Sequence, residues 1–460
     1  MTFKSRHLAA LFAAIGLLSA PTMAGAQSLT ESLAAAYSTN PQLNAARSQL
    51  RGIDENIAIA RSGNRPQIAG SMSWTSQTFK TVGGPLRGTS GNNPFEIQLT
   101  LTQPLFQGFQ VRNSIRQAES AVKAQRASLK NTEQTVLLNT ATAFEDVIQN
   151  RAIVSLRESD VRFLAEQVRA AQDRFEVGEG TRTDVSQAEA RQAQAQSALN
   201  FARANLASSE ATYRQLTGLV AKRLRDNVAV ERFIPPSLKA AEATGQKIHP
   251  AIIASLFDVD TATFNVKALE GQFLPSVNMV GAVGTTFDPS PTSGAYRQDS
   301  ASLGLNVTVP IYQGGRVSAQ VRQAKEQLGT SRIQVDLTRD QVRQNTVAAW
   351  AGYIASVRSI QAARTGVFAA QLALDGVIEE QRVGQRTTLD VLDAQRDLVS
   401  AQVTLVQSER DKDVAAFNLM AAIGHLSSKR LSLNVAIYRP AEHTDAVRDK
   451  WFGLRTPDGR

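Results

Sequence analysis

The chain contains the same sequence pattern twice, at a nearly constant spacing. The pair Asn40-Pro41 returns as His249-Pro250, 209 residues later. The segment Gln-Pro-Leu-Phe-Gln-Gly at 103–108 returns as Val-Pro-Ile-Tyr-Gln-Gly at 309–314, 206 residues later. Solenoid repeats run about 20–50 residues, so this longer period indicates the duplication of a domain-sized unit. Each half is expected to build the same elements.

The first 26 residues are predicted to be a Sec-type signal peptide. Lys4 and Arg6 precede an apolar run over 8–20, and small residues at 24–26 suit cleavage after position 26. A membrane anchor is the weaker interpretation, because a spanning helix needs about 20 apolar residues. The chain has no cysteine, which excludes disulfides, thiolate metal sites, cysteine nucleophiles and a lipid-modified N-terminus. The mature chain is expected to be exported.

The mature chain is expected to divide into two structural repeats and two connecting segments. Each repeat should hold a helix, two β-strands and a long helical hairpin, and the repeats span 27–218 and 248–426. The linker at 219–247 and the C-terminal segment at 427–460 fit neither a long helix nor a strand well. We expect both to form an equatorial belt around the helices.

Very long helices are predicted in the middle of each half. No proline lies between Pro104 and Pro235, and the second half repeats this gap from Pro310 to Pro440. Apolar residues recur every seven positions, as in helices that wind around neighbours. A helix over about 111–175 would be on the order of 100 Å long, whereas ordinary helices have three or four turns.

Gly178 and Gly384 are predicted to turn each long helix into an antiparallel partner. A threonine and an aspartate three residues later follow each glycine, and together they fit a capping box at the start of the second helix. The two pairs are Thr181 with Asp184 and Thr387 with Asp390.

Two strands are predicted in each half. Residues 95–102 and 303–309 alternate apolar and polar side chains, and weaker partners lie at 68–78 and 277–286. Strands of about ten residues with this alternation are typical of membrane barrels. A soluble hairpin with one buried face is the alternative, but the signal peptide favours the membrane. Exposed loops rich in Gly, Pro, Ser and Thr are expected at 80–94 and 288–300.

Four strands cannot form a barrel by themselves. Open sheet edges are not tolerated in lipid, and the smallest closed barrels have about eight strands. Other chains must therefore complete the barrel, and three copies would provide twelve strands. The predicted fold is an α+β membrane protein: an internally duplicated chain whose homotrimer forms a 12-stranded β-barrel, continuous with a long α-helical coiled-coil barrel.

Charge and motifs exclude several other functions. The formal net charge is +9, but acidic and basic residues alternate along helical faces, which predicts solvated surface and no nucleic-acid partner. The histidines are scattered, and neither metal-ligand spacing, a nucleophile elbow nor a phosphate loop is present. We predict no catalytic residues, no cofactor, no metal site and no enzymatic activity.

Three features carry a resemblance to a known family. They are the duplication, the two junctions at 103–108 and 309–314, and the motif Val-Gly-x-x-Thr-x-x-Asp-Val-x-x-Ala at the predicted hairpin tips. In these features the chain resembles the TolC family of outer-membrane efflux and secretion channels. The resemblance covers essentially the whole mature chain. It implies a homotrimer in the outer-membrane lipid of a Gram-negative bacterium, with a long periplasmic extension. The trimer would be the exit duct of a tripartite efflux pump or a type I secretion system. Its partners would be a periplasmic adaptor (membrane fusion) protein and an inner-membrane RND or ABC-type transporter.

The resemblance also implies a periplasmic entrance at the tip of the second hairpin. Asp390 and Asp393 match the two aspartates that line this constriction in the family. They are three residues apart and hence share one helical face. Six carboxylates in a trimer should make the resting pore cation-selective. Capping of the helix by Asp390 remains open as a second role.

Gate-holding contacts are implied between the two hairpins. By resemblance, Thr183 and Asp184 of the first hairpin face Gln381 and Arg386 of the second. Gln381 stands where the best-known family pattern has an aromatic hydroxyl. Our hypothesis is that Asp184, Gln381 and Arg386 hold the closed state.

An exported trimeric coiled-coil adhesin or periplasmic scaffold is the alternative function. It would also have heptads and a signal peptide, but it would not need duplicated strands in the middle of each half. The strands therefore favour the channel. The sequence does not indicate the transported substrate.

Overall fold

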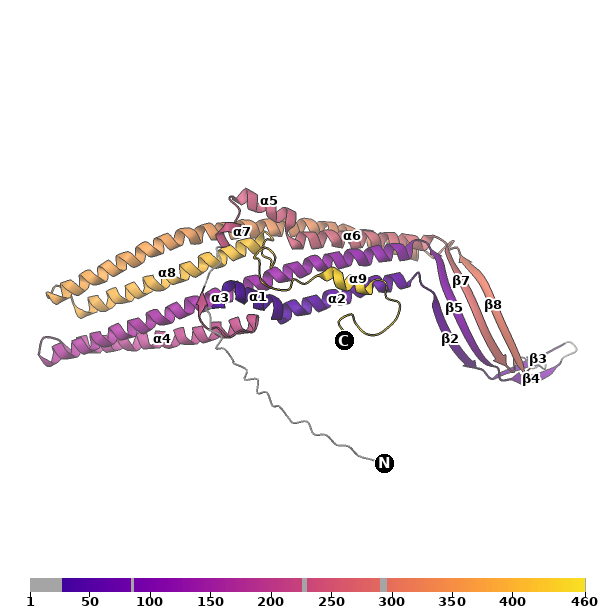
Figure 1. Cartoon of the computed structure of the whole chain (residues 1–460), viewed down its shortest axis with the longest axis horizontal. Coiled ribbons are helices and arrows are strands. Elements are labelled where there is room, and N and C mark those ends of the chain that lie inside the picture. The colour runs from indigo at the N-terminus through magenta and orange to yellow at the C-terminus, as the bar shows by residue number, and fades with distance from the viewer. Residues whose placement is uncertain (1–26, 84–86, 226–229, 290–295, 460) are drawn as a thin grey trace, which may run out of the picture.

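The computed structural model describes residues 27–83, 87–225, 230–289 and 296–459. The predicted signal peptide at 1–26 lies outside these described residues. The molecule is elongated, with helical hairpins at one end and strands at the other (Figure 1). Its two longest helices are α3 (Gln110–Glu176) and α7 (Arg316–Arg382), each of 67 residues. At 1.5 Å per residue each is about 100 Å long, which confirms the prediction from the proline-free stretches.

Two consecutive helices, separated at a proline, precede the strands in each half, and in the second half the first of them lies in the predicted linker. The residue before that proline caps the second helix: Asn40 Oδ1 accepts from the Gln42 N–H at 2.9 Å, and His249 Nδ1 accepts from the Ala251 N–H at 3.2 Å. Proline suits the first helical position because it lacks the N–H that would be unpaired there. This local geometry explains why the dipeptide recurs. The helices are α1 (Leu29–Thr39), α2 (Pro41–Ser62), α5 (Leu238–Ile248) and α6 (Pro250–Glu270).

Two helical hairpins follow the long helices, as predicted. Helix α3 turns into α4 (Arg182–Thr217), and α7 turns into α8 (Thr388–Ala422). Gly178 and Gly384 adopt φ angles of 80° and 78°. Glycine adopts this left-handed conformation without strain, so both glycines end their helices where the sequence indicates.

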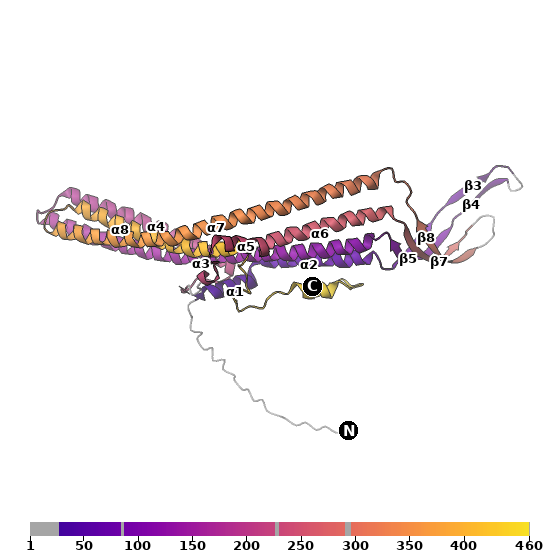
Figure 2. The ribbon, with the colours of Figure 1, turned by 90° about the horizontal axis from the view of Figure 1, so that it is seen from above.

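The main sheet contains the four predicted strands. They are antiparallel and lie in the order β2-β5-β7-β8, so that β2 and β8 are its edges. The helices next to the strands have the same order, because α3 packs against α2 and α6, and α6 packs against α7 (Figure 2). Strands and helices therefore form one continuous layer. The strands are β2 (Gln67–Trp74), β5 (Phe95–Gln107), β7 (Ser276–Phe287) and β8 (Arg297–Thr308).

One predicted loop contains a small hairpin. Strands β3 (Gln77–Thr81) and β4 (Gly88–Asn92) pair where the sequence predicted an irregular connection at 80–94. Backbone pairing needs no apolar pattern, so the polar composition concealed these strands. The Asn92 amide donates to the Asp288 carbonyl at 3.1 Å and thereby ties this hairpin to the end of β7.

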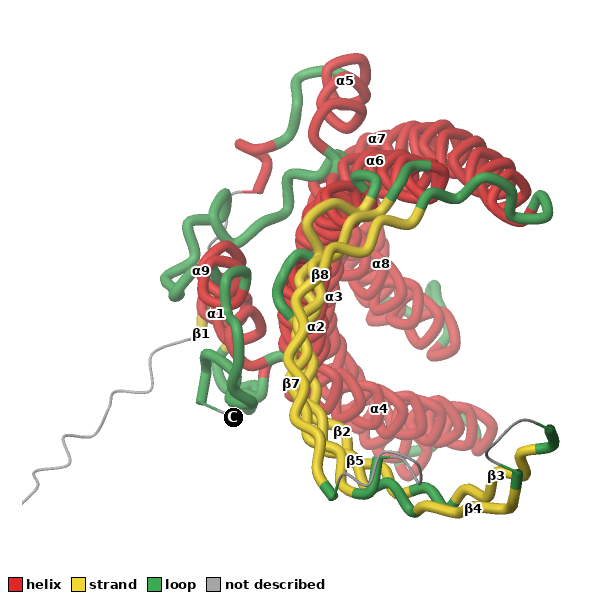
Figure 3. Tube along the Cα trace, turned by 90° about the vertical axis from the view of Figure 1, so that its right-hand side faces the viewer, coloured by secondary structure: helices red, strands yellow, loops and turns green. Residues whose placement is uncertain are grey.

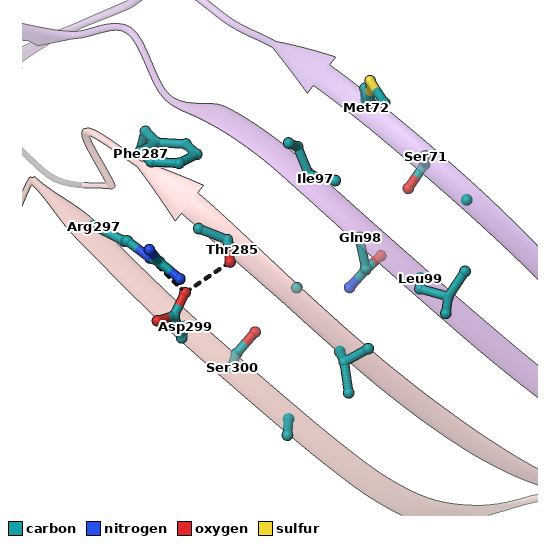
Figure 4. A pocket seen from close by; sticks show the side chains of 14 residues that line it. Ser71, Met72, Ile97, Gln98, Leu99, Thr285, Phe287, Arg297, Asp299 and Ser300 are labelled. Carbon is teal, nitrogen blue, oxygen red and sulfur yellow. Dashed lines mark hydrogen bonds and ion pairs between the residues drawn. The ribbon is translucent and has the colours of Figure 1, made fainter.

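One face of the main sheet is apolar and exposed. Directly opposite residues share a face, as do residues two apart on one strand. Met72, Ile97 and Leu303 lie on this face and are 74%, 41% and 75% exposed. Polar side chains enter this face near the loop end of β8, where Asp299 accepts from Thr285 Oγ1 at 2.7 Å and from Arg297 Nε at 2.9 Å (Figure 4). No helix within the described residues is long and apolar enough to cross a membrane.

Seen from the strand end, the layer follows an arc, and the shorter elements lie on its convex side (Figure 3). These include α1, α5 and α9 (Pro440–Val447). Strand β1 (Gln27–Ser28) pairs in parallel with β6 (Leu224–Arg225), and two short 3-10 turns, η1 and η2, span Val230–Phe233 and Gly271–Phe273. The largest core cluster joins α1, α3, α4, α8 and the C-terminal segment through side chains such as Leu29, Phe144, Tyr213 and Phe417.

The two repeats approach each other closely where β5 joins α3. A Cβ added at Gly108 would overlap the carbonyl oxygen of Gly271, and a Cβ at Gly271 would overlap that of Gly108. Gly108 also has a φ of 57°, in the left-handed region. Its counterpart Gly314 has a similar φ of 61°, but open space surrounds it.

These two glycines allow the close approach to be tested separately from backbone strain. Both Gly108→Ala and Gly314→Ala should incur a left-handed penalty of about 1–2 kcal/mol. Gly108→Ala should cost about 1–3 kcal/mol more, because its methyl group meets a backbone atom. Thermal unfolding of the purified variants, followed by circular dichroism, measures the difference. Equal melting temperatures would contradict a tight junction.

Candidate functional site at the hairpin tips

The tips of the two hairpins lie at the end of the molecule that is farthest from the strands (Figure 1). Both contain the predicted capping boxes. In the first, the Asp184 N–H donates to Thr181 Oγ1 at 3.2 Å, and the Thr181 N–H donates to Asp184 Oδ2 at 3.0 Å. In the second, Asp390 and Thr387 make the same pair of bonds at 3.3 and 2.9 Å. The sequence prediction of both caps is confirmed.

These caps also perturb the two aspartates. The hydroxyl and then the backbone N–H of Thr181 lower the pKa of Asp184 below 3.8. The backbone N–H and then the hydroxyl of Thr387 lower the pKa of Asp390 below 3.8 in the same way. Hydrogen bonds to the ionised form favour that form. Both carboxylates are therefore charged at neutral pH and remain charged in mildly acidic solution.

Asp393 has structural partners that the sequence analysis did not foresee. Its Oδ1 lies 2.8 Å from Nη2 of Arg191 on α4 and 3.3 Å from Nη1 of Arg396, one turn away on α8. The pair with Arg191 joins the second hairpin to the first. Asp393 thus has a role within a single chain in addition to the predicted role at the entrance.

The predicted gate residues lie near the tips, but their bonds stay within their own hairpins. Arg386 Nε donates to Glu380 Oε2 at 2.8 Å, and Gln381 donates to Thr388 Oγ1 at 3.3 Å. Thr183 is exposed, and Asp184 bonds to Thr181. Within the described part of one chain, no hydrogen bond or ion pair joins Asp184 to Gln381 or Arg386. The proposed lock therefore requires either another conformation or a neighbouring chain.

A buried link between the hairpins lies two residues beyond Asp393. The Gln395 amide donates to Asp160 Oδ1 at 3.0 Å, and the two residues are 7% and 6% exposed. Beside it, Leu392 packs into a cluster formed by α3 and α4 that includes Leu164 and Ala188. The sequence carried no local signal for this contact, because its partners are 235 residues apart.

The histidines and acids do not form a second site. No group of three or more potential metal-ligating residues occurs among the residues that the structure describes. Burial lowers the pKa of His249 and of His425, and His443 contacts the buried carboxylate of Asp54 at 3.0 Å. These three histidines are part of the packing of the equatorial region.

The fold and these tips define a class of protein: a duplicated chain with an antiparallel sheet at one end and two helical hairpins whose first helices are each about 100 Å long. The sequence pattern of the family described as "Outer membrane efflux protein" matches residues 33–219 and 246–425. The chain therefore belongs to this family. It is a transport duct of the outer membrane and not an enzyme, as the sequence analysis predicted.

Individual relatives agree with this assignment. The outer membrane efflux protein BepC of Brucella suis biovar 1 is 47% identical over 454 residues, which cover 98% of each chain. The outer membrane protein TolC of Escherichia coli is 27% identical over 434 residues, covering 91% of this chain and 87% of TolC. The crystal structure of the Campylobacter jejuni CmeC outer membrane channel has the same fold, with a TM-score of 0.75, 16% identity and coverage of 92% and 89%. The predicted resemblance to the TolC family is confirmed.

The link between Arg191 and Asp393 can be tested against a matched ion pair on the same helix. Arg203 pairs with Glu158 at 2.8 Å, but that pair lies within the first hairpin. Exposed pairs contribute about 0.2–1 kcal/mol, which corresponds to at most about a fivefold change in an opening equilibrium. We expect Arg191→Gln to raise the open fraction of single channels in a planar bilayer by up to that factor. Arg203→Gln should leave the open fraction unchanged. Equal effects of the two substitutions would contradict the idea that Arg191 restrains the second hairpin.

Proposed function

We propose that three copies of this chain close a 12-stranded barrel and a helical tunnel. The observation that supports this most strongly is the four-stranded sheet with two open edges, β2 and β8, and an exposed apolar face. Lipid cannot satisfy the backbone groups of an open edge. Pairing of β8 of one chain with β2 of the next would satisfy both edges and leave the apolar face toward lipid.

Helix α7 supports the same assembly. It follows the edge strand β8, and several large apolar side chains along it are exposed in the single chain. A coiled-coil helix places such residues against a neighbour. The next protomer would cover this stripe, whose members include Ile333, Leu337, Val357, Phe368 and Leu372, between 42% and 72% exposed.

In this proposal the trimer is the exit duct of a larger machine. The mature chain would start after the signal peptide at 1–26, and the repeats at 27–218 and 248–426 would each supply half of a protomer's wall. A duct has no chemistry that supplies energy, so transport has to be driven by a partner. The partners are a periplasmic adaptor protein and an inner-membrane transporter of the RND or ABC type. The same duct would serve a tripartite efflux pump or type I secretion.

The hairpin tips are the periplasmic entrance in this proposal. Asp390 and Asp393 of three chains would surround the constriction, although each also has a role within its own chain. Thr183, Asp184, Gln381 and Arg386 would hold the closed state through contacts between neighbouring protomers. Arg386 suits this role because its guanidinium has donors beyond the Nε that Glu380 occupies.

Conductance of the purified protein in a planar bilayer tests the duct and its entrance together. We expect a small cation-selective conductance that loses its selectivity in the double variant Asp390→Asn/Asp393→Asn. Asparagine retains a capping oxygen, so the start of α8 should stay folded. Asp397→Asn is the control, because Asp397 is an exposed carboxylate on the same helix, and its ion-pair partner in the described part of the chain is Arg396. Absence of conductance from folded protein would instead favour the exported coiled-coil scaffold.

The pKa of Asp390 adds a pH dependence to this measurement. Its folded pKa lies below 3.8, so its charge is present above that value and is lost as the pH falls through the folded pKa. Cation selectivity of the wild-type channel should therefore persist at pH 5. Loss of selectivity already between pH 6 and pH 5 would contradict this expectation, and it would mean that repulsion among the clustered carboxylates raises the pKa of Asp390 more than its cap lowers it.

Arg386→Ser tests the proposed lock. Removal of the guanidinium should raise the resting conductance in the same bilayer assay, because contacts that favour the closed state are lost. Arg382→Ser is a suitable control, since Arg382 pairs with Glu379 on the same helix at 2.7 Å. Unchanged conductance in Arg386→Ser would contradict a role of this residue in closure.

A further inference from the structure

A cavity of about 500 Å³ lies in the equatorial region, away from the hairpin tips and the strands. Helices α2, α3 and α6 form its walls together with the segment that follows α8. Helix α3 lies between α2 and α6 in the helical layer. The cavity is therefore not next to α7, the outer helix that follows β8. Its volume falls within the range of about 300–1,000 Å³ that is typical of small-molecule sites.

The lining of the cavity combines cations with apolar side chains. Five basic residues face one acid, Glu133, and that carboxylate already accepts from the Ser428 N–H at 2.7 Å. Within the described residues, none of the five cations has a carboxylate within ion-pair distance. The cations are Arg47, Lys123, Arg126, Lys130 and Lys429, and the apolar part includes Leu43, Leu129, Ile253 and Phe257.

Unpaired polar atoms also line the cavity. Gln134 is only 4% exposed, and neither its amide oxygen nor its amide nitrogen has a hydrogen-bond partner within the described chain. The same holds for Arg126 Nε and the Tyr438 hydroxyl. Buried polar groups in folded proteins are nearly always paired, so such groups call for an explanation. A bound polar ligand would satisfy them.

The order of residues along α3 suggests how a ligand would enter. Lys123, Arg126, Lys130 and Gln134 are spaced by three or four residues and so lie along one face of the helix. The two lysines are exposed, Arg126 is half-buried and Gln134 is buried. The cations therefore mark the mouth of the cavity, and the unpaired amide lies in its interior.

We propose that this equatorial cavity binds an amphipathic organic anion. The basic residues would attract a carboxylate or phosphate head, and the apolar wall would bury an acyl or aromatic body. A cation would be repelled by the lining, and an inorganic anion would leave the apolar wall without a partner. The proposal goes beyond the transport function and does not depend on it.

A photoreactive ten-carbon carboxylate that carries a diazirine tests the site on the full-length mature protein in a nonionic detergent. After illumination, labelled peptides should map to residues that line the cavity, such as those around Arg126 and Phe257. Decanoate should compete with the label, whereas decyltrimethylammonium, of equal chain length and opposite charge, should not. Equal competition by the two compounds, or labelling spread along the exposed helices, would overturn the proposal.

Two variants separate binding from folding. Lys123→Gln/Lys130→Gln removes the two exposed cations at the mouth, and we expect about five- to tenfold weaker competition by decanoate. Lys80→Gln/Lys239→Gln changes the net charge equally at exposed lysines outside the cavity and should bind as the wild type does. Gln134→Leu should retain or raise the melting temperature but weaken binding. Wild-type binding in both cavity variants would refute the site.

Two sources of such an anion can be distinguished in the same assay. Competition by phosphatidylglycerol in mixed micelles would identify a membrane lipid with one chain inserted. Competition by decanoate and decyl phosphate alone would identify a soluble single-chain compound. Either result supports an amphipathic anion as the ligand.

Discussion

The rest of this structure depends on the need to pair the backbone groups of its sheet edges. The chain contributes four antiparallel strands, and two of them have a free edge. A membrane offers no hydrogen bonds to such an edge, which is the reason for the proposal that neighbouring chains complete the sheet. The helical layer also has a free edge, because α7, next to β8, exposes apolar side chains along its length. The sheet and the helical layer have matching free edges because α2 leads into the edge strand β2, and the edge strand β8 leads into α7.

The duplication explains how one chain builds such a layer. Each repeat contributes two strands and the helices beside them, and the repeats meet between β5 and β7 and between α3 and α6. Two glycines, Gly108 and Gly271, permit this meeting at the junction of strands and helices. The equatorial core then secures the repeats to one another on the convex side. The cavity with unpaired polar groups occurs in this same region, where irregular segments cover the regular layer.

At the hairpin tips, the residues that we propose for the entrance also have structural roles within the chain. Asp390 was open to two interpretations from the sequence, and its role as a cap is present in the structure. Asp393 had been assigned to the entrance alone, yet it pairs with Arg191 of the other hairpin. The link between Asp160 and Gln395 was not foreseen at all. A carboxylate that already has a basic partner attracts ions less strongly than a free one, so the field at the proposed entrance would depend on these contacts.

Local physical rules made much of the fold predictable. The absence of proline predicted the long helices, and glycine predicted the turns at Gly178 and Gly384. The strict alternation of apolar and polar residues predicted the strands. These features act over a few residues, and they recur because the gene segment was duplicated. Three things were decided only by the tertiary structure: the hairpin at 77–92, the partners of Asp393 and Arg386, and the equatorial cavity. The cavity and the pair of Asp393 with Arg191 depend on side chains that meet across long stretches of chain. The hairpin depends on backbone pairing between polar segments, and the bond of Arg386 on the shape of the tip. Neither periodicity nor spacing records these contacts.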